Sequence, residues 1–165
     1  MTPSRDVLVV GGGLVGAAAA LGLARSGRTV VLVDRSRPSA STGRFGMDVR
    51  NIACSPASRT LLETLGVWSA LHGAPYLRMC VWEERGTAAL HFDAAEAGRT
   101  ELGWILENGP TVEALWRQLE AEAGVEIRIG TLDGVSIDAD RVQVTVDGRP
   151  CAGRLLVGVD GARSA

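Results

Sequence analysis

The chain has 165 residues, of which 46% are hydrophobic and 22% are charged. This balance is typical of one globular domain with its own core, and it excludes an intrinsically disordered chain. The formal net charge is −2 and no basic run occurs, so the sequence offers no electrostatic footprint for a nucleic-acid partner.

The first 34 residues predict a strand, a helix and a second strand. Residues 6–10 form an apolar run typical of a strand buried on both faces, and three glycines follow it. Residues 14–25 are rich in alanine and leucine, which favours a helix, and Gly27 suits its end. Residues 29–33 are β-branched and apolar and end at Asp34. The length fits a βαβ crossover.

The middle of the chain predicts two helices and a hairpin. Residues 35–54 lack periodicity and are expected to form a loop. Ser55 and Pro56 then predict a helix that Gly66 ends, with an apolar face of Leu61, Leu62 and Leu65. Residues 77–82 and 87–92 predict two strands joined by a polar turn. A second helix opens at Asn108 and Pro110 and closes at Gly124.

The last third of the chain predicts β structure. Residues 125–130 and 142–146 alternate apolar and polar side chains, and a short strand is expected at about 135–137. Asp147 and Gly148 are a hairpin-turn signal. Residues 155–159 predict a second buried apolar strand, which leads into Asp160 and Gly161.

The glycine turn after the first strand satisfies the pattern G-x-G-x-x-G at residues 11–16. Its position between a strand and a helix makes it a phosphate-binding signature. We expect Gly11 to permit the tight turn, Gly13 to let a diphosphate approach the backbone, and Gly16 to let the helix pack closely. Leu14 and Val15 begin the helix, where free N–H groups and a partial positive charge favour an anion.

Asp34 ends the second strand, where a carboxylate can accept hydrogen bonds from the ribose hydroxyls of an adenosine. Such a carboxylate would repel a 2′-phosphate, so NADP is not expected at this site. We include the next residue, Arg35, in the predicted site. The motif leaves FAD and NAD as alternatives, and a glycine-rich turn that binds nothing is the structural alternative.

The order of the elements favours FAD. A NAD-binding domain would continue with further strand–helix pairs, whereas this chain gives a helix, a hairpin, a helix and then strands. This order resembles the glutathione-reductase-like fold, an α/β Rossmann-type FAD-binding fold in which a β-meander crosses over the parallel sheet.

Within that fold the chain resembles the class A flavin monooxygenases, and among them the hydroxylases of ubiquinone biosynthesis. Residues 47–68 resemble the family stretch D-x-R-x-x-A…L-x-x-L-G-[IV]-W, with Cys54 where leucine is usual. Residues 155–164 resemble the family's DG motif, and residues 103–108 resemble the segment before a helix that contacts the flavin.

The resemblance implies roles for four further residues. Arg50 would lie beside the FAD diphosphate or ribityl chain, since its fork of donors suits phosphate oxygens. Asn108 would contact the ribityl side, Leu132 would contact adenine through its backbone, and Asp160 would help to bind FAD and the incoming NAD(P)H. The structural alternatives are a solvated loop arginine, a helix cap and a turn aspartate. The four tryptophans are predicted to pack rather than stack on a flavin.

The resemblance also implies an FAD-dependent aromatic-ring hydroxylase that uses NAD(P)H and O2. The cofactor carries this chemistry, so no catalytic side chain is predicted, and the three cysteines and two histidines show no metal spacing. The substrate would be a small aromatic compound, with or without a prenyl chain. Other subunits of a quinone-biosynthesis assembly and self-association remain open as partners.

The predicted organisation is a truncated family architecture. Residues 1–72 and 103–165 are assigned to two parts of the FAD-binding domain, and residues 73–102 to a hairpin of the substrate domain. Such a fragment is expected to lack hydroxylase activity and to bind FAD weakly. No signal peptide or membrane span is recognised, which predicts a cytoplasmic protein, with peripheral contact to the inner membrane as an alternative. Another FAD oxidoreductase, such as a prenyl reductase or halogenase, and an inactive nucleotide-binding remnant are the competing hypotheses.

Overall fold

The computed structural model describes residues 5–39 and 46–161. They divide into two compact units, Met1–Ala40 with Gly109–Ala165, and Ser41–Asn108. The first unit contains the phosphate-loop motif, and the second contains the predicted hairpin.

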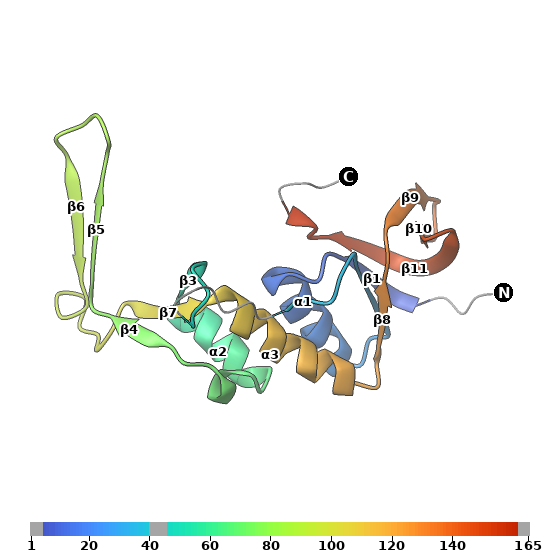
Figure 1. The fold of residues 1–165 in the computed structure, drawn as a ribbon, viewed down its shortest axis with the longest axis horizontal. Coiled ribbons are helices and arrows are strands. Elements are labelled where there is room, and N and C mark those ends of the chain that lie inside the picture. Colours follow the sequence, from blue (N-terminus) through green and yellow to red (C-terminus); the bar gives the residue numbers. More distant parts are fainter. Residues whose placement is uncertain (1–4, 40–45, 162–165) are drawn as a thin grey trace. The chain divides into compact units, whose positions relative to one another are not determined.

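The first unit is built on a six-stranded sheet with the order β8-β2-β1-β11-β10-β9 (Figure 1). The strands β8, β2, β1 and β11 run parallel, and β10 runs antiparallel to its two neighbours, β11 and β9. Helices α1 and α3 also belong to the first unit, although α3 starts at the last residue of the second unit. The bounds are β1 (Arg5–Val10), α1 (Leu14–Arg25), β2 (Val30–Asp34), α3 (Asn108–Ala121), β8 (Val125–Ile129), β9 (Leu132–Ile137), β10 (Val142–Val146) and β11 (Arg149–Gly158).

The long strand β11 joins the antiparallel and parallel parts of this sheet. Its first half pairs with β10, and its second half pairs with β1, as the partners Val144↔Cys151 and Val7↔Leu155 show. The turn between β10 and β11 places both Asp147 (φ 46°) and Gly148 (φ 72°) at positive φ, which is the geometry of a tight hairpin turn. The predicted FAD-type fold with a β-meander is thereby confirmed.

Both faces of the parallel strands are covered. Side chains of β1 and β2 pack on one face against the meander, in a cluster made of Leu8, Val10, Val31, Val33, Val142, Val144, Val146 and Cys151. Successive strand residues point to opposite faces, so the intervening buried residues of β1 and β2 face the other side. Helices α1 and α3 lie side by side, where Arg25 bonds to Gln118 (2.9 Å) and Glu122 (3.3 Å) (Figure 1).

The meander and β11 correct two details of the sequence prediction. Strand β9 begins at Leu132, three residues before the expected start at 135. The segment 155–159 is not a fully buried strand, because Leu155 is 53% exposed and Leu156 is half-buried. The residues of β11 that are buried are Cys151, Ala152 and Gly153. The reason is that the second half of β11 borders an open cavity, described below.

The second unit combines a three-stranded antiparallel sheet, in the order β3-β7-β4, with the hairpin β5–β6. Its elements are β3 (Asn51–Cys54), α2 (Pro56–Thr64), a 3₁₀ turn η1 (Trp68–Ala70), β4 (Ala74–Tyr76), β5 (Arg78–Trp82), β6 (Ala89–Asp93) and β7 (Gly103–Glu107). Residues 51–54 form strand β3, so the prediction of a loop for residues 35–54 is wrong at its end. Strand β3 is too short to show an alternation, and its partner β7 lies about 50 residues later.

The predicted start of α2 is confirmed. The Ser55 hydroxyl oxygen accepts a hydrogen bond from the Ser58 N–H (3.2 Å), and Pro56 occupies the first turn. Leu62 and Leu65 are buried as expected. Leu61 is 49% exposed, so the apolar face is narrower than predicted.

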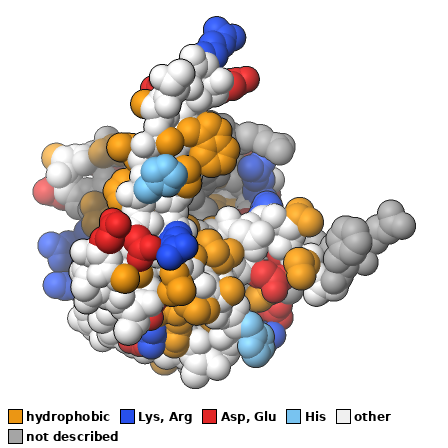
Figure 2. Space-filling view, turned by 90° about the vertical axis from the view of Figure 1, so that its left-hand side faces the viewer, with side chains coloured by type: hydrophobic (Ala, Val, Ile, Leu, Met, Phe, Trp, Pro, Cys, Tyr) orange, Lys and Arg blue, Asp and Glu red, His pale blue; other side chains and the backbone are white. Residues whose placement is uncertain are grey.

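The hairpin β5–β6 carries exposed apolar side chains. The cross-strand pairs Met79↔Phe92 and Val81↔Leu90 lie on one face of the ribbon, because they are two residues apart on each strand. Figure 2 shows hydrophobic side chains gathered along this hairpin. Cys80 of β5 is exposed.

Cys54 and Cys151 are buried, and this burial raises the pKa of both thiols above the usual value.

In the described part of the chain, no helix is both long enough and apolar enough to cross a membrane.

Candidate functional site

The loop between β1 and α1 shows why the motif needs glycine at its first and last positions. Gly11 has φ +106°, and a Cβ there would overlap the carbonyl group of Val159. A Cβ on Gly16 would overlap the carbonyl oxygen of Gly11. These two glycines therefore allow the loop to pass between β11 and the first turn of α1.

Gly13 differs from them, because it is exposed and no atom lies within 4 Å of a Cβ built on it. It is the N-cap of the 12-residue helix α1 and makes no side-chain cap hydrogen bond. The first turn of α1 contains no acidic residue. Space, N–H groups and the positive end of the helix dipole thus meet at this point, as an anion site requires.

The backbone of Gly12 is held on both sides by side chains. Its N–H donates to Asp34 Oδ2 (2.6 Å), and its carbonyl oxygen accepts from Trp116 Nε1–H (2.7 Å). Trp116 lies on α3 and is 1% exposed. The sequence predicted Trp116 only as a packing residue, since helical periodicity indicates burial but not the partner of the indole nitrogen.

Asp34 is half-buried at the end of β2, and both of its carboxylate oxygens accept backbone hydrogen bonds. Oδ2 accepts from Gly12 and Oδ1 accepts from the Ser36 N–H (3.0 Å). Each oxygen has room for a second hydrogen bond, since a carboxylate offers about four acceptor positions. The carboxylate can therefore hold the loop and still accept a ribose hydroxyl.

A cavity of about 200 Å³ lies at the carboxyl ends of the parallel strands. Ligands of open α/β sheets bind at this end of the strands. The cavity brings together five of the residues predicted from the sequence, namely Gly11, Asp34, Arg35, Leu132 and Asp160. Its volume is below that of pockets for drug-sized ligands, so it fits one part of a dinucleotide rather than the whole.

Arg50 and Asn108 belong to the second unit, where they contact each other through their backbones. The Asn108 N–H donates to the Arg50 carbonyl oxygen (2.9 Å). The buried Asp48 accepts from the Arg50 N–H (2.9 Å), and the Asp48 N–H donates to Glu107 (2.6 Å). The backbone of Arg50 is thus fixed at the end of β7, while its side chain is 74% exposed.

The segment that resembles the DG motif, residues 155–164, begins in the second half of β11 and continues past its end. The Val159 N–H donates to the Val10 carbonyl oxygen (2.8 Å), which holds this segment beside the end of β1. Gly161 has φ +83°, a conformation that suits glycine. Residues 162–164 of the predicted motif lie outside the described residues.

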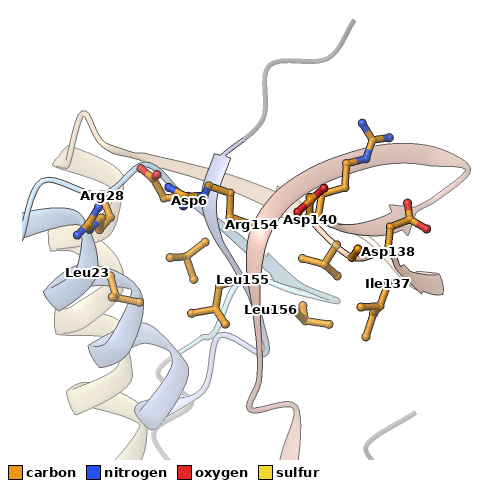
Figure 3. Close-up of a pocket in the computed structure, with 13 residues that line it drawn as sticks. Asp6, Leu23, Arg28, Ile137, Asp138, Asp140, Arg154, Leu155 and Leu156 are labelled. Atoms are coloured by element: carbon orange, nitrogen blue, oxygen red, sulfur yellow. The ribbon is translucent and has the colours of Figure 1, made fainter.

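A larger cavity, of about 790 Å³, lies at the opposite end of β1 (Figure 3). Its lining includes Asp6 and Val7 near the start of β1, Arg28 beyond the carboxyl end of α1, and Leu155. The negative end of a helix dipole and the carboxylates of Asp6, Asp138 and Asp140 disfavour a phosphate there, although three arginines also line it. Its volume would favour this cavity as the ligand-binding site, but its position at the amino ends of the strands argues against a nucleotide there.

Comparison with known proteins adds the family. Residues 6–142 match the model of the family described as FAD dependent oxidoreductase. The chain belongs to this family. The cofactor of the family is FAD, which agrees with the fold and with the open space at Gly13 in the phosphate loop.

Two curated relatives are ubiquinone hydroxylases. The chain is 38% identical to 3-demethoxyubiquinol 3-hydroxylase of Escherichia coli (strain K12) over 164 residues, which is 96% of this chain and 42% of that protein. It is 36% identical to ubiquinone hydroxylase UbiL of Rhodospirillum rubrum, over 96% of this chain and 38% of the relative. The chain therefore spans about two fifths of the length of these relatives.

Solved structures of other proteins share the fold. The p-nitrophenol 4-monooxygenase PnpA from Pseudomonas putida DLL-E4 superposes with a TM-score of 0.73 at 22% identity, over 100% of this chain and 43% of that chain. CtdE, solved in complex with FAD, superposes with a TM-score of 0.70 at 17% identity, over 98% of this chain and 39% of that chain. At these identities the likeness shows the fold alone.

Proposed function

We propose that the chain is the FAD-binding part of an FAD-dependent aromatic-ring hydroxylase of the kind that acts in ubiquinone biosynthesis. The observation that carries the proposal is the loop geometry, in which Gly13 is open to solvent at the start of α1 while Asp34 holds the adjacent Gly12. The similarity to the two ubiquinone hydroxylases supports the choice of reaction.

Each predicted site residue has a role in this proposal. The N–H groups of Gly13, Leu14 and Val15 bind the diphosphate at the amino end of α1, with Gly11 and Gly16 shaping the loop. Asp34 accepts hydrogen bonds from the ribose, and Arg35, Leu132 and Asp160 line the same cavity. Arg50 and Asn108 act on the diphosphate and ribityl part of FAD.

When bound, FAD supplies the redox chemistry, with NAD(P)H as the electron donor and O2 as the oxidant. The part played by these residues is to bind and orient the cofactor through its phosphates and ribose. The substrate that fits the curated relatives is an aromatic quinone precursor, with or without a prenyl chain. The hairpin within residues 73–102 is proposed to belong to the substrate domain, and residues 1–72 and 103–165 to the FAD-binding domain.

The cellular setting and the partners are part of the same proposal. A cytoplasmic protein with peripheral contact to the inner membrane would reach a prenylated ring. The exposed apolar face of β5–β6 favours association with a second copy or with another subunit of a quinone-biosynthesis assembly. Fractionation of cells into soluble and membrane pools tests the location directly.

Two alternatives remain in competition with this proposal. Another FAD-dependent oxidoreductase of the same fold would bind the same cofactor, and would be recognised by the product of its reaction. An inactive remnant would fail to bind FAD.

Titration of the purified chain with FAD, followed by the loss of flavin fluorescence, tests the site. We expect saturable binding that ADP competes for and that 2′-phospho-ADP-ribose does not, because Asp34 repels the extra phosphate. Asp34→Ala should weaken FAD binding at least about tenfold, since hydrogen bonds to a charged group are lost. Asp140→Ala, in the larger cavity, is the matched control and should bind FAD normally. The absence of saturable binding by the parent chain would contradict the proposal.

A further inference from the structure

We infer that Trp116 is a positioning residue for the FAD diphosphate, because it orients the peptide group that presents the Gly13 N–H. This inference rests on the proposed FAD site and adds a residue that the phosphate-loop motif does not contain. The ligand it serves is a diphosphate ester, whose oxygens accept hydrogen bonds from backbone N–H groups.

The contact between Trp116 and the loop joins residues 104 positions apart. Trp116 is 1% exposed, and its Nε1–H donates to the carbonyl oxygen of Gly12 (2.7 Å). The ring also fills the space beside Gly12, where a Cβ would lie 2.5 Å from a ring carbon. The indole therefore contacts the loop through both its nitrogen and its ring.

The direction of one peptide group follows from this contact. In a planar trans peptide, the carbonyl of Gly12 and the N–H of Gly13 point in opposite directions. The Gly12 carbonyl points inward to a buried tryptophan, so the Gly13 N–H points outward. Gly13 is exposed and has no protein atom near its Cβ position, so there is open space at this residue for a diphosphate.

An anchor is needed here because Gly12 and Gly13 are both glycines. Their backbones have access to a wide range of φ and ψ, so the peptide between them could rotate and turn its carbonyl oxygen toward the phosphate. A carbonyl oxygen would repel an anion, whereas an N–H attracts it. Asp34 anchors the preceding peptide through the Gly12 N–H (2.6 Å), and Trp116 anchors the following one.

The test replaces the hydrogen-bond donor and keeps an aromatic ring. Trp116→Phe removes Nε1–H from the buried contact, and Trp82→Phe, at a position that is 70% exposed on β5, is the matched control. The full 165-residue chain is first measured without ligand by NMR. We expect a scalar coupling across the hydrogen bond between Trp116 15Nε1 and the Gly12 carbonyl 13C in the parent chain and in the control.

The second measurement titrates each protein with FAD, ADP and adenosine. We expect Trp116→Phe to weaken the binding of FAD and ADP about tenfold, because the buried Gly12 carbonyl loses its hydrogen-bond donor. The binding of adenosine, which has no phosphate, should change less than about twofold. A role in packing alone would weaken all three ligands alike. Trp82→Phe should leave all three affinities unchanged.

Four outcomes overturn the inference. If the coupling is absent, the hydrogen bond to the Gly12 carbonyl does not form. If Trp116→Phe weakens adenosine binding as much as ADP binding, Trp116 has no specific effect on the phosphate. If the parent chain and Trp116→Phe bind FAD and ADP equally well, the inference fails and the proposed function stands. If the parent chain binds neither FAD nor ADP, the proposed function itself fails and this inference fails with it.

Discussion

Gly13 and Gly16 stand three residues apart in the same loop, yet they lack a side chain for different physical reasons. At Gly16 the protein itself occupies the space, since a Cβ would overlap the Gly11 carbonyl oxygen. At Gly13 the space is open to solvent, and its φ of −67° and ψ of −171° are accessible to alanine. Folding thus requires glycine at position 16, whereas the proposed FAD site requires it at position 13.

Alanine substitutions at the two positions should separate these requirements. Gly16→Ala should lower the stability of the chain by several kcal/mol, on the order of the largest single-site effects, because backbone atoms must move. Gly13→Ala should change stability by no more than about 1 kcal/mol, because alanine can adopt these backbone angles but is a poorer N-cap than glycine, and it should weaken FAD binding at least about tenfold. Thermal unfolding and FAD titration measure the two effects. A loss of stability in Gly13→Ala as large as that in Gly16→Ala, or normal FAD binding by Gly13→Ala, would contradict this assignment.

At the scale of elements, one arginine joins three parts of the second unit. The guanidinium of Arg59 on α2 lies 4.4 Å from the ring centroid of Trp104 on β7 and 5.0 Å from that of Trp68 in η1. The two rings meet edge to face, with centroids 5.5 Å apart. Glu63, one turn further along α2, accepts from Arg59 Nε (2.7 Å). The Arg59 guanidinium thus contacts side chains of both η1 and β7 and links these two elements to α2.

Removal of this cation should destabilise the chain more than removal of an ordinary surface ion pair. Arg59→Gln loses two cation–π contacts, and we expect a loss of about 1–2 kcal/mol in the free energy of unfolding. Arg117→Gln breaks only the exposed i,i+4 pair with Glu113 and should cost about 0.5 kcal/mol or less. Urea unfolding of both variants measures the difference. Equal losses would show that the aromatic contacts contribute little.

At the scale of the whole chain, the sheet of the first unit connects segments from both ends of the sequence. Glu126 on β8 accepts from Arg5 on β1 (2.7 Å), across the intervening β2, and from Arg128 (2.7 Å). Burial alone would raise the pKa of this carboxyl, but the hydrogen bonds from Arg128 and Arg5 hold the pKa of Glu126 below its usual value.

This shift makes part of the stability dependent on pH. A carboxyl whose pKa is lowered by folding stabilises the folded state above its unfolded pKa, about 4.3, and loses that contribution as the pH falls through the lower folded value. Glu126→Gln should therefore cost about 0.5–1 kcal/mol at pH 6–7, a small value because the side chain is 35% exposed and screened by solvent. Below about pH 4 the cost should shrink toward zero. Unfolding curves of parent and variant from pH 2.5 to 7 test this; a difference independent of pH would contradict it.

How much of the structure the sequence predicts differs from one part of the chain to another. In residues 6–34, the apolar runs, the glycines and Asp34 predict both the elements and the site, because each part contacts its sequence neighbours. In residues 51–54, the same reasoning fails, because β3 exists only through pairing with β7. Leu155 looks like a core residue by composition, yet it borders a cavity.

The sequence by itself determined the βαβ unit, the phosphate loop and the resemblance to FAD-dependent hydroxylases. These features depend on residue types at fixed short spacings, and backbone sterics and helix termini act over the same short range. Only the tertiary structure decided that Leu132 and Asp160 join Gly11 and Asp34 around one cavity, and that Trp116 holds the Gly12 carbonyl. Those contacts join residues more than 90 positions apart, and only the pairing of strands and the packing of α3 bring them together.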